Sequence, residues 1–357
     1  MLGAGLAGLA LADALGARGH RVLIIEKDVP GAGASGTPVG LVNPAAGRKA
    51  NLSWEAERCY AAVEQNLQKV QDGGGKPFFF RSGLLRPALD DASLTNFRKA
   101  YERGDWPAGW CRWMDPGEVS RANPFLIETG GGLCITVGLT VCVPAFLRAW
   151  SAYLAERGIP CLTRQDYTLI REGNHWKIRT GKQGSVQAGS VIFAGGHTVI
   201  RSPYWRDIPI HPVKGQISEY TAETDLSGWK MPIAASGYFA RAGSNRFVAG
   251  GTYEHEFTDE RSDARGQGTL EKKVGAVMPS LLSQSALTGQ WAGVRASTPN
   301  RLPILGPHAS EPNLHLFSGL GSKGLLYAAF TAGLLADFLS GSGRLPEEVN
   351  IDRLKKL

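Results

Sequence analysis

Three glycines near the start of the chain have the spacing of a nucleotide-binding loop. Gly3, Gly5 and Gly8 spell G-x-G-x-x-G, and apolar residues at helical spacing follow them. Such glycines allow a tight turn, a close approach of pyrophosphate to the backbone, and close packing of a helix on a strand. The helix N-terminus then offers N–H donors and the positive end of its dipole to the phosphates. This pattern predicts that the chain binds a dinucleotide.

An acidic residue stands where this chemistry needs one. Residues 22–26 are expected to form a buried strand, and Glu26 closes it about 20 residues after Gly5. A carboxylate at this place accepts hydrogen bonds from the hydroxyls of an adenosine ribose. Only Met1 and Leu2 precede the loop, whereas a parallel strand usually needs about five residues. We therefore expect that a few apolar residues are missing upstream.

The elements that must position these residues alternate as in an α/β protein. A helix is expected from Pro144 to Gly158, and hairpin strands over residues 168–188 lead into a buried strand at 191–194. Residues 314–341 read as a strand, a second glycine loop and a helix whose N-terminus is another anion site. The length of 357 residues favours two domains. We expect residues 1–75, 141–203 and 291–357 in the first, and residues 76–140 and 204–290 in the second.

The composition argues against several classes of protein. The five cysteines lie apart without a C-x-x-C pair, so neither a disulfide framework nor a zinc site is expected. No histidines have the spacing of metal ligands. No secretory signal is visible, and glycines and Pro144 interrupt the longest uncharged run, residues 129–147. We expect a cytoplasmic protein without a metal or a membrane span.

The order of these motifs resembles a known superfamily. The first loop with Glu26 is followed by GASG at residues 33–36 and by FAGG at residues 193–196. HPVKGQI (211–217), WAGVRASTPNRLPILG (291–306) and GLGSKGLLYAA (319–329) complete the pattern over essentially the whole chain. The chain resembles the D-amino-acid-oxidase-like FAD-dependent amine oxidoreductases. The resemblance implies bound FAD, a Rossmann-like FAD domain and a discontinuous α+β substrate domain.

Within the superfamily, AGVRAST, LPILG and GLGSKGL are most similar to the FAD-dependent oxidoreductase domain of the bifunctional tRNA 5-methylaminomethyl-2-thiouridine biosynthesis protein. Glycine oxidase is the next most similar and shares an arginine at the position of Arg295. The first resemblance implies removal of the carboxymethyl group from 5-carboxymethylaminomethyl(-2-thio)uridine at the tRNA wobble position, with release of glyoxylate. It implies only this oxidative step, and a separate methyltransferase partner acting on the product.

The resemblance implies that Arg295 holds the substrate carboxylate and positions the methylene. Lys323, in the second glycine loop, is expected to add a positive charge near the flavin. Tyr253 and Tyr238, on expected strands of the substrate domain, are expected to reach the carboxylate through their hydroxyls. Structural roles are the alternative for each of the four. The residues predicted to contact FAD are Gly3, Gly5, Leu6, Ala7, Gly8, Glu26, Lys27, Ala34, Ser35, Gly36, Gly40, Leu41, Ala194, Gly195, Gly196, Gly321, Ser322, Lys323, Gly324 and Leu325.

Two observations bear on an RNA substrate. The net charge of +7 suits a polyanionic partner, although many enzymes without one are equally basic. Residues 76–113 interleave cations with aromatic residues, the ingredients of phosphate contact and base stacking, but aromatic residues in a substrate domain are more often core. Two alternatives to tRNA therefore stay open. One is a small-molecule oxidase acting on glycine, sarcosine or a D-amino acid, and the other is a non-catalytic flavoprotein that binds RNA or protein.

Overall fold

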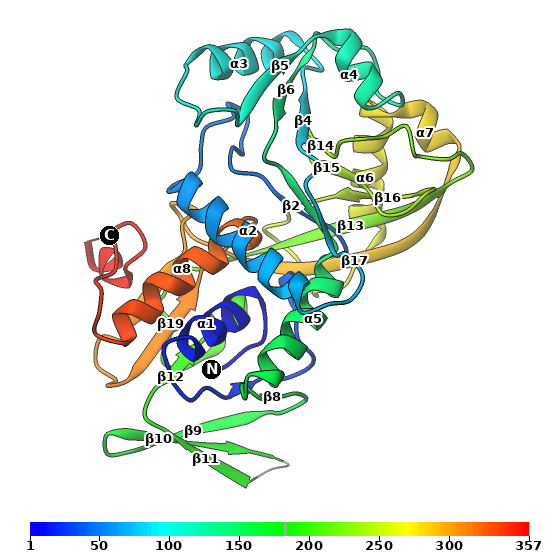
Figure 1. Ribbon diagram of the computed structural model, residues 1–357. Coiled ribbons are helices and arrows are strands. Elements are labelled where there is room, and N and C mark those ends of the chain that lie inside the picture. Colours follow the sequence, from blue (N-terminus) through cyan, green and yellow to red (C-terminus); the bar gives the residue numbers. More distant parts are fainter. Residues whose placement is uncertain (182–183, 357) are drawn as a thin grey trace.

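The computed structural model describes residues 1–181 and 184–356, and Figure 1 shows their arrangement. The helices are α1 (Leu6–Gly16), α2 (Ala56–Asp72), α3 (Asp91–Glu102), α4 (Pro116–Ala122), α5 (Val143–Glu156), α6 (Ala264–Val277), α7 (Pro279–Ser283) and α8 (Gly324–Leu339). Short 3-10 helices are η1 (Ala34–Gly36), η2 (Gly196–Arg201) and η3 (Ile351–Lys356). Helix α5 has the predicted proline in its first turn. The helix after the first glycine loop is also confirmed.

The N-terminal residues lie within a mostly parallel sheet. Its strands are β1 (Ile24–Ile25), β8 (Cys161–Leu162), β12 (Val191–Phe193), β18 (Ile304–Pro307) and β19 (Leu314–Ser318). Leu2 forms parallel bridges to both Ile25 and Phe193, so the first residues of the chain take the central place between β1 and β12. Strand β12 pairs with β19 in parallel, and β18 adds an antiparallel edge.

The strand predicted at residues 22–26 is shorter than expected. Only Ile24 and Ile25 are in strand conformation, where Ile24 pairs with Cys161 on one side. On the other side the neighbour is the single bridge at Leu2, and the backbone N–H of Ile25 donates to the carbonyl of Met1 at 2.9 Å. The N-terminal segment beside β1 forms only this one bridge and so provides few ladder hydrogen bonds. The part of β1 in regular strand conformation is therefore short.

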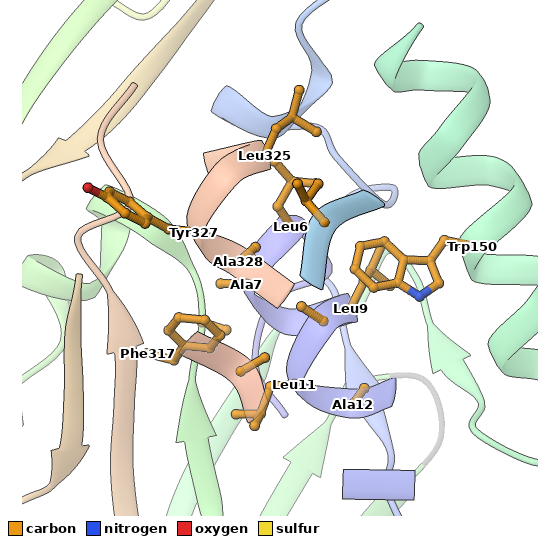
Figure 2. Packing of buried hydrophobic residues seen from close by; sticks show 14 of the residues in the cluster. Leu6, Ala7, Leu9, Leu11, Ala12, Trp150, Phe317, Leu325, Tyr327 and Ala328 are labelled. Atoms are coloured by element: carbon orange, nitrogen blue, oxygen red, sulfur yellow. The ribbon is translucent and has the colours of Figure 1, made fainter. Parts of the chain in front are cut away.

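Helices α1, α2, α5 and α8 enclose the largest apolar core. Figure 2 shows Leu6 of α1 beside Leu325 of α8, and Ala7 beside Ala328. Nearly every residue of α1 is buried, because helices and the sheet cover it on all sides. Its buried Asp13 accepts hydrogen bonds from Lys69 and, at 3.2 Å, from the indole of Trp150. This packing brings the N-termini of α1 and α8 together, since a Cβ on Gly324 would lie 3.1 Å from Leu6 Cδ1.

The second large sheet has eight strands and lies on the other side of these helices (Figure 1). The order is β17-β13-β16-β15-β14-β4-β6-β5, antiparallel except for the pair β14 and β4. The strands are β4 (Leu84–Pro87), β5 (Cys111–Met114), β6 (Gly132–Ile135), β13 (His211–Ala222), β14 (Ile233–Ala234), β15 (Tyr238–Arg241), β16 (Arg246–Gly250) and β17 (Ser285–Ser297). Helices α6 and α7 cover part of it.

Two three-stranded sheets complete the fold. One contains β9 (Tyr167–Glu172), β10 (His175–Thr180) and β11 (Gly184–Ala188), which confirms the predicted hairpins. The other contains β2 (Gly40–Val42), β3 (Phe79–Phe80) and β7 (Leu139–Val141). The α/β fold is as predicted, with an FAD-type domain and a mixed eight-stranded sheet, which is called the substrate sheet below. The exact division into two domains stays a prediction, and β17 runs across its boundary at residue 291.

Candidate functional site

The first glycine loop can be built only from glycine at two positions. Gly3 has a φ of +108°, and a Cβ there would lie 2.7 Å from the carbonyl oxygen of Ala194. A Cβ on Gly8 would lie 2.0 Å from the carbonyl oxygen of Gly3. Both contacts are with backbone, which has no room to move. The glycines therefore let the loop turn tightly between the end of β12 and the start of α1, as the sequence pattern predicts.

Two polar side chains line the start of α1. Glu26 Oε2 accepts a hydrogen bond from the backbone N–H of Ala4 at 2.7 Å, and Oε1 accepts one from Asp28 at 2.9 Å. Ser35 Oγ accepts a hydrogen bond from the backbone N–H of Leu6 at 3.0 Å. The carboxylate thus lies beside the glycine loop, and the segment 31–36 lies against the helix N-terminus. The structure brings together these residues, which are far apart in the sequence.

This arrangement fits a dinucleotide such as FAD. The N-cap residues of α1 and α8 provide no side-chain cap, and neither helix has an acidic residue in its first turn. Apart from the N–H of Leu6, which donates to Ser35, the first turns leave amide N–H groups and a positive dipole end for phosphate or flavin oxygens. The Glu26 carboxylate has further lone pairs for ribose hydroxyls. Residues 3–8, 34–36 and 194–196 would hold the pyrophosphate side, and residues 321–325 the other helix end.

Of the other predicted FAD contacts, Gly40 and Gly321 lie in the packing around the second glycine loop, whereas the side chain of Lys27 points to solvent. Gly40 packs against Leu325, because a Cβ at residue 40 would lie 2.5 Å from Leu325 Cδ1. The backbone N–H of Gly321 donates to the carbonyl of Ala296 at 2.9 Å, which ties the second loop to β17. Lys27 is not brought to the loop: its side chain is 81% exposed and its Nζ lies 3.8 Å from Asp166. For Lys27, the structure shows a solvated lysine at the surface.

Arg295 lies on β17, at the edge of the eight-stranded sheet. Its Nη1 donates to the carbonyl of Thr252 at 2.9 Å, and its guanidinium lies 4.5 Å from the centre of the Tyr253 ring. A Cβ on Gly215 would lie 2.2 Å from Arg295 Nη2, so glycine on the neighbouring strand makes room for the guanidinium. Among residues 1–181 and 184–356, no carboxylate forms an ion pair with Arg295. A partly buried arginine without an ion-pair partner is suited to bind the carboxylate of a ligand.

The two predicted tyrosines have different surroundings. The Tyr253 ring is 62% exposed and covers Arg295. The Tyr238 hydroxyl donates to the carbonyl of Val39 at 2.8 Å, and Thr37 Oγ1 lies 3.4 Å away. Burial raises the pKa of Tyr238 to about 12, so its phenol stays protonated at neutral pH. Tyr238 therefore connects the substrate sheet to the segment before Gly40, and substrate contact by either hydroxyl stays a prediction.

Lys323 is the N-cap residue of α8, and its charged end lies beside the side chain of Tyr327, one turn further along. Its Nζ is 3.4 Å from the Tyr327 hydroxyl and 5.4 Å from the centre of the same ring. Burial and the charge of Arg301 lower the pKa of Lys323. A desolvated cation at a helix N-terminus is suited to stabilise negative charge on a bound group. Its catalytic role stays a prediction.

Sequence reasoning missed several residues around Arg295. Trp291 fills the space above Gly293, since a Cβ there would lie 2.5 Å from its ring, and its Nε1 lies 3.8 Å from a Cβ on Gly36. Lys273 of α6 donates to the carbonyl of Gly251 at 2.9 Å. Glycines facing each other on β13 and β17, at residues 215 and 293, were a usable signal. Glycine inside a strand often marks a close approach of another group.

The aromatic residues of segment 76–113 are largely structural. Phe78, Phe79 and Phe97 are buried. Three of the seven cations also form ion pairs: Arg81 with Glu64 at 2.8 Å, Arg103 with Asp105 at 3.1 Å and Arg112 with Glu118 at 2.7 Å. Only Phe80 and Tyr101 are exposed aromatic residues in this segment. The core interpretation of the segment is therefore favoured over an RNA surface.

Within the described part of the chain, no group of three or more His, Cys, Asp or Glu side chains is placed to hold a metal ion. The helices of residues 1–181 and 184–356 include none that is long and apolar enough to cross a membrane.

Comparison with known proteins shows similarity along nearly the whole chain. Curated relatives include the tRNA 5-methylaminomethyl-2-thiouridine biosynthesis bifunctional protein MnmC of Thiobacillus denitrificans, 29% identical over 99% of this chain and 58% of the relative. The same protein of Burkholderia multivorans is 27% identical over 96% of this chain and 56% of the relative. The chain thus spans somewhat over half the length of these relatives.

Solved structures have the same fold. Glycine oxidase from Geobacillus kaustophilus superposes with a TM-score of 0.84 at 24% identity, covering 96% of this chain and 94% of the other. Iminodiacetate oxidase from Chelativorans sp. BNC1 has a TM-score of 0.85 at 25% identity, with 97% and 96% covered. A family model described as DAO, FAD dependent oxidoreductase, matches residues 2–338. The chain therefore belongs to the DAO family of FAD-dependent oxidoreductases, with the fold and the cofactor that its sequence predicts.

Proposed function

We propose that this enzyme oxidises the C–N bond of an N-substituted glycine. Its substrate in this proposal is 5-carboxymethylaminomethyl(-2-thio)uridine at the wobble position of tRNA, from which it removes the carboxymethyl group. The coarser statement, an FAD-dependent oxidoreductase that acts on C–N bonds, follows from its family and relatives. The proposal goes beyond that statement by identifying the group attached to the nitrogen as the modified uridine of tRNA.

The observation that carries the proposal is the state of Arg295. Its guanidinium is held by the Thr252 carbonyl and the Tyr253 ring, and no described carboxylate neutralises it. A two-pronged ion pair with a substrate carboxylate completes this environment. Binding at that end would fix the adjacent methylene in one orientation, and orientation lowers the barrier to its oxidation.

The reaction balances without a catalytic base. The substrate is R–NH–CH2–COO⁻, and FAD supplies the two-electron acceptor. The methylene loses a hydride and the nitrogen loses a proton, which leaves R–N=CH–COO⁻. Water then adds to the C=N carbon, the C–N bond breaks, and the products are R–NH2 and glyoxylate. Arg295 would hold the carboxylate through all of these steps.

The relatives support tRNA as the substrate. Those named as tRNA 5-methylaminomethyl-2-thiouridine biosynthesis proteins align with nearly all of this chain. They are described as bifunctional, and this chain spans 58% of the first. A methyltransferase partner that acts on the aminomethyl product is also part of the proposal.

A small-molecule amine is the second candidate. The similarity to iminodiacetate oxidase, at 25% identity over 97% of this chain, favours it. So does the structural role of most cations and aromatic residues in segment 76–113, which leaves fewer groups there for RNA contact. Both candidates present a carboxylate beside a methylene and an amine nitrogen, so Arg295 serves either one.

Flavin reduction without oxygen separates the candidates. The FAD-loaded enzyme is mixed with tRNA carrying the carboxymethylaminomethyl group, and in parallel with glycine, sarcosine or iminodiacetate. The proposal predicts that micromolar tRNA bleaches the flavin absorbance faster than millimolar amounts of the free amines. Rapid bleaching by a free amine and none by tRNA would support the second candidate. Flavin that no amine reduces would instead indicate a binding protein without turnover.

A further inference from the structure

Two cations contact Gly251, the residue that follows strand β16. Lys273 Nζ donates to the carbonyl oxygen of Gly251 at 2.9 Å. Arg295 Nη2 lies so close to the same residue that a Cβ on Gly251 would be 2.8 Å from it. The two side chains come from different elements, α6 and β17, and both are partly buried. The fold thus brings two positive charges to one peptide unit.

Neither charge has an ion-pair partner in the part of the chain that the structure describes. Lys273 and Arg295 instead donate to the backbone carbonyls of Gly251 and Thr252. Burial and the charge of Arg295 lower the pKa of Lys273, as expected for neighbouring like charges without an acid between them. Like charges in a partly buried site are unfavourable unless an anion joins them.

Lys214, on strand β13 of the eight-stranded sheet, shows how the chain usually accommodates a buried lysine. Lys214 is 2% exposed, and its Nζ lies 2.7 Å from Asp263 and 3.7 Å from Glu254. The chain therefore supplies two acids for a buried lysine that has a structural role. It supplies none for Lys273, which lies beside the arginine of the candidate site.

Lys273 also has N–H donors that the carbonyl of Gly251 does not use. An ammonium group carries three N–H donors, and Gly251 accepts one of them. The stem of Lys273 passes close to another glycine, because a Cβ on Gly237 would lie 3.6 Å from its Cδ. The exposed ring of Tyr253 lies against Arg295, the other cation of this pair.

We propose that Lys273 binds a second anionic group of the substrate, whose first carboxylate is held by Arg295. This inference rests on the proposed carboxylate role of Arg295. The substrate class is then an amine with two anionic groups. In a free amine such as iminodiacetate the second group is a carboxylate, and in tRNA it is a phosphate near the modified base. Lys273 would thus determine specificity, and a substrate with one anionic group would gain little from it.

The test compares substrates that differ by one anionic group. Values of kcat/KM are measured for sarcosine, iminodiacetate and modified tRNA with wild type and Lys273→Met, which keeps the length of the stem. We expect a loss of about 10-fold to 100-fold for iminodiacetate or for tRNA, and less than about threefold for sarcosine. Loss with iminodiacetate assigns a carboxylate as the second group, and loss with tRNA alone assigns a phosphate. Equal losses on all three, or none, would overturn the proposal.

Control variants separate charge from folding. Lys272→Met removes the exposed neighbouring lysine of α6 and should leave all three values unchanged. Lys273→Arg keeps the charge and should restore part of the preference. FAD content and Tm are measured for each variant, so that a misfolded protein is recognised.

Equilibrium binding makes the test independent of turnover. Malonate and acetate are titrated into the FAD-loaded enzyme, and binding is followed by the change in flavin absorbance. Lys273→Met should weaken malonate by at least about tenfold and acetate by much less. If no amine is oxidised but this selective loss appears, the proposed function fails and the second anion site stands. If amines are oxidised but malonate is unaffected, the second anion site fails alone.

Discussion

At the scale of single residues, the neighbours of Arg295 explain how its charge is held in place. Thr252, whose carbonyl accepts from Arg295, is held by a polar network behind it. Thr252 Oγ1 hydrogen-bonds to Glu254, and Gln216 Nε2 donates to the same carboxylate at 3.0 and 3.2 Å. The backbone N–H of Gln216 also donates to Thr252 Oγ1 at 2.9 Å, so Thr252 is held from two sides. Arg295 is thereby oriented before any substrate arrives.

Removing Arg295 should therefore affect carboxylated amines most. For Arg295→Ala we expect kcat/KM to fall about 100-fold or more, which corresponds to about 3 kcal/mol of lost transition-state binding. Arg295→Lys keeps the charge but not the two-pronged geometry, and should fall about tenfold. Steady-state kinetics with the best substrate measure both.

The control is Arg246→Ala, an exposed arginine of β16 that pairs with Glu219 at 3.0 Å on the same sheet. It should leave kcat/KM unchanged. Unchanged kinetics for Arg295→Ala would remove Arg295 from the site.

At the scale of elements, the tight contact between the glycine loop and α1 determines FAD binding. Gly8→Ala would place a methyl group 2.0 Å from the carbonyl oxygen of Gly3, so the loop or the helix must shift. We expect the purified variant to contain little FAD, measured as the ratio of flavin to protein absorbance.

Gly333→Ala is the matched control, because residue 333 is also helical and a Cβ there meets nothing within 4 Å. It should keep its FAD and gain about 0.5–1 kcal/mol of helix stability. A full FAD complement in Gly8→Ala would contradict the account of the loop.

Strand β19 predicts a pH dependence of stability. His315 is 8% exposed, its Nδ1 has no hydrogen-bond partner, and burial lowers its pKa to about 4 from 6.5. Between these values the unfolded chain binds a proton that the folded chain does not, so stability falls as pH drops from about 6.5 to about 4. The loss from this group is at most about 3 kcal/mol and does not grow below pH 4.

Urea unfolding at pH 7 and pH 5 measures this effect. His315→Leu should show a smaller difference between the two pH values than wild type. An identical difference in both proteins would mean that His315 does not titrate as described.

How far the elements can be predicted from sequence depends on local signals. Helices α1 and α8 were predictable because glycine loops precede them and apolar residues recur along them. Strand β1 was predicted too long, since its length depends on the central neighbour at Leu2. Lys273 and Thr252 were not predictable, because α6 and the end of β16 meet Arg295 only through tertiary packing. The exposure of the Lys27 side chain was not predictable either, and its contact with FAD stays a prediction.

At the scale of the whole molecule, FAD binding should hold distant segments together. Residues 3–8, 34–36, 194–196 and 321–325 belong to four separate parts of the chain, and the loops among them meet at the N-termini of α1 and α8. A ligand that bridges them stabilises the folded state by mass action. At 100 times its Kd, this is about 2.7 kcal/mol.

Differential scanning fluorimetry of the FAD-free protein should therefore show a Tm that rises with added FAD. AMP offers the ribose and one phosphate without the flavin, and should produce a smaller rise. A Tm that does not respond to FAD would contradict the assignment of these segments.

The measurement that tests the central claim most directly is nucleoside analysis of treated tRNA. Transfer RNA carrying 5-carboxymethylaminomethyluridine is incubated with the FAD-loaded enzyme, digested to nucleosides and analysed by mass spectrometry, while released glyoxylate is assayed. We predict conversion to the aminomethyl nucleoside with an equal amount of glyoxylate, by wild type and Arg246→Ala but not by Arg295→Ala. An intact carboxymethyl nucleoside, together with rapid flavin reduction by a free amine, would contradict tRNA as the substrate.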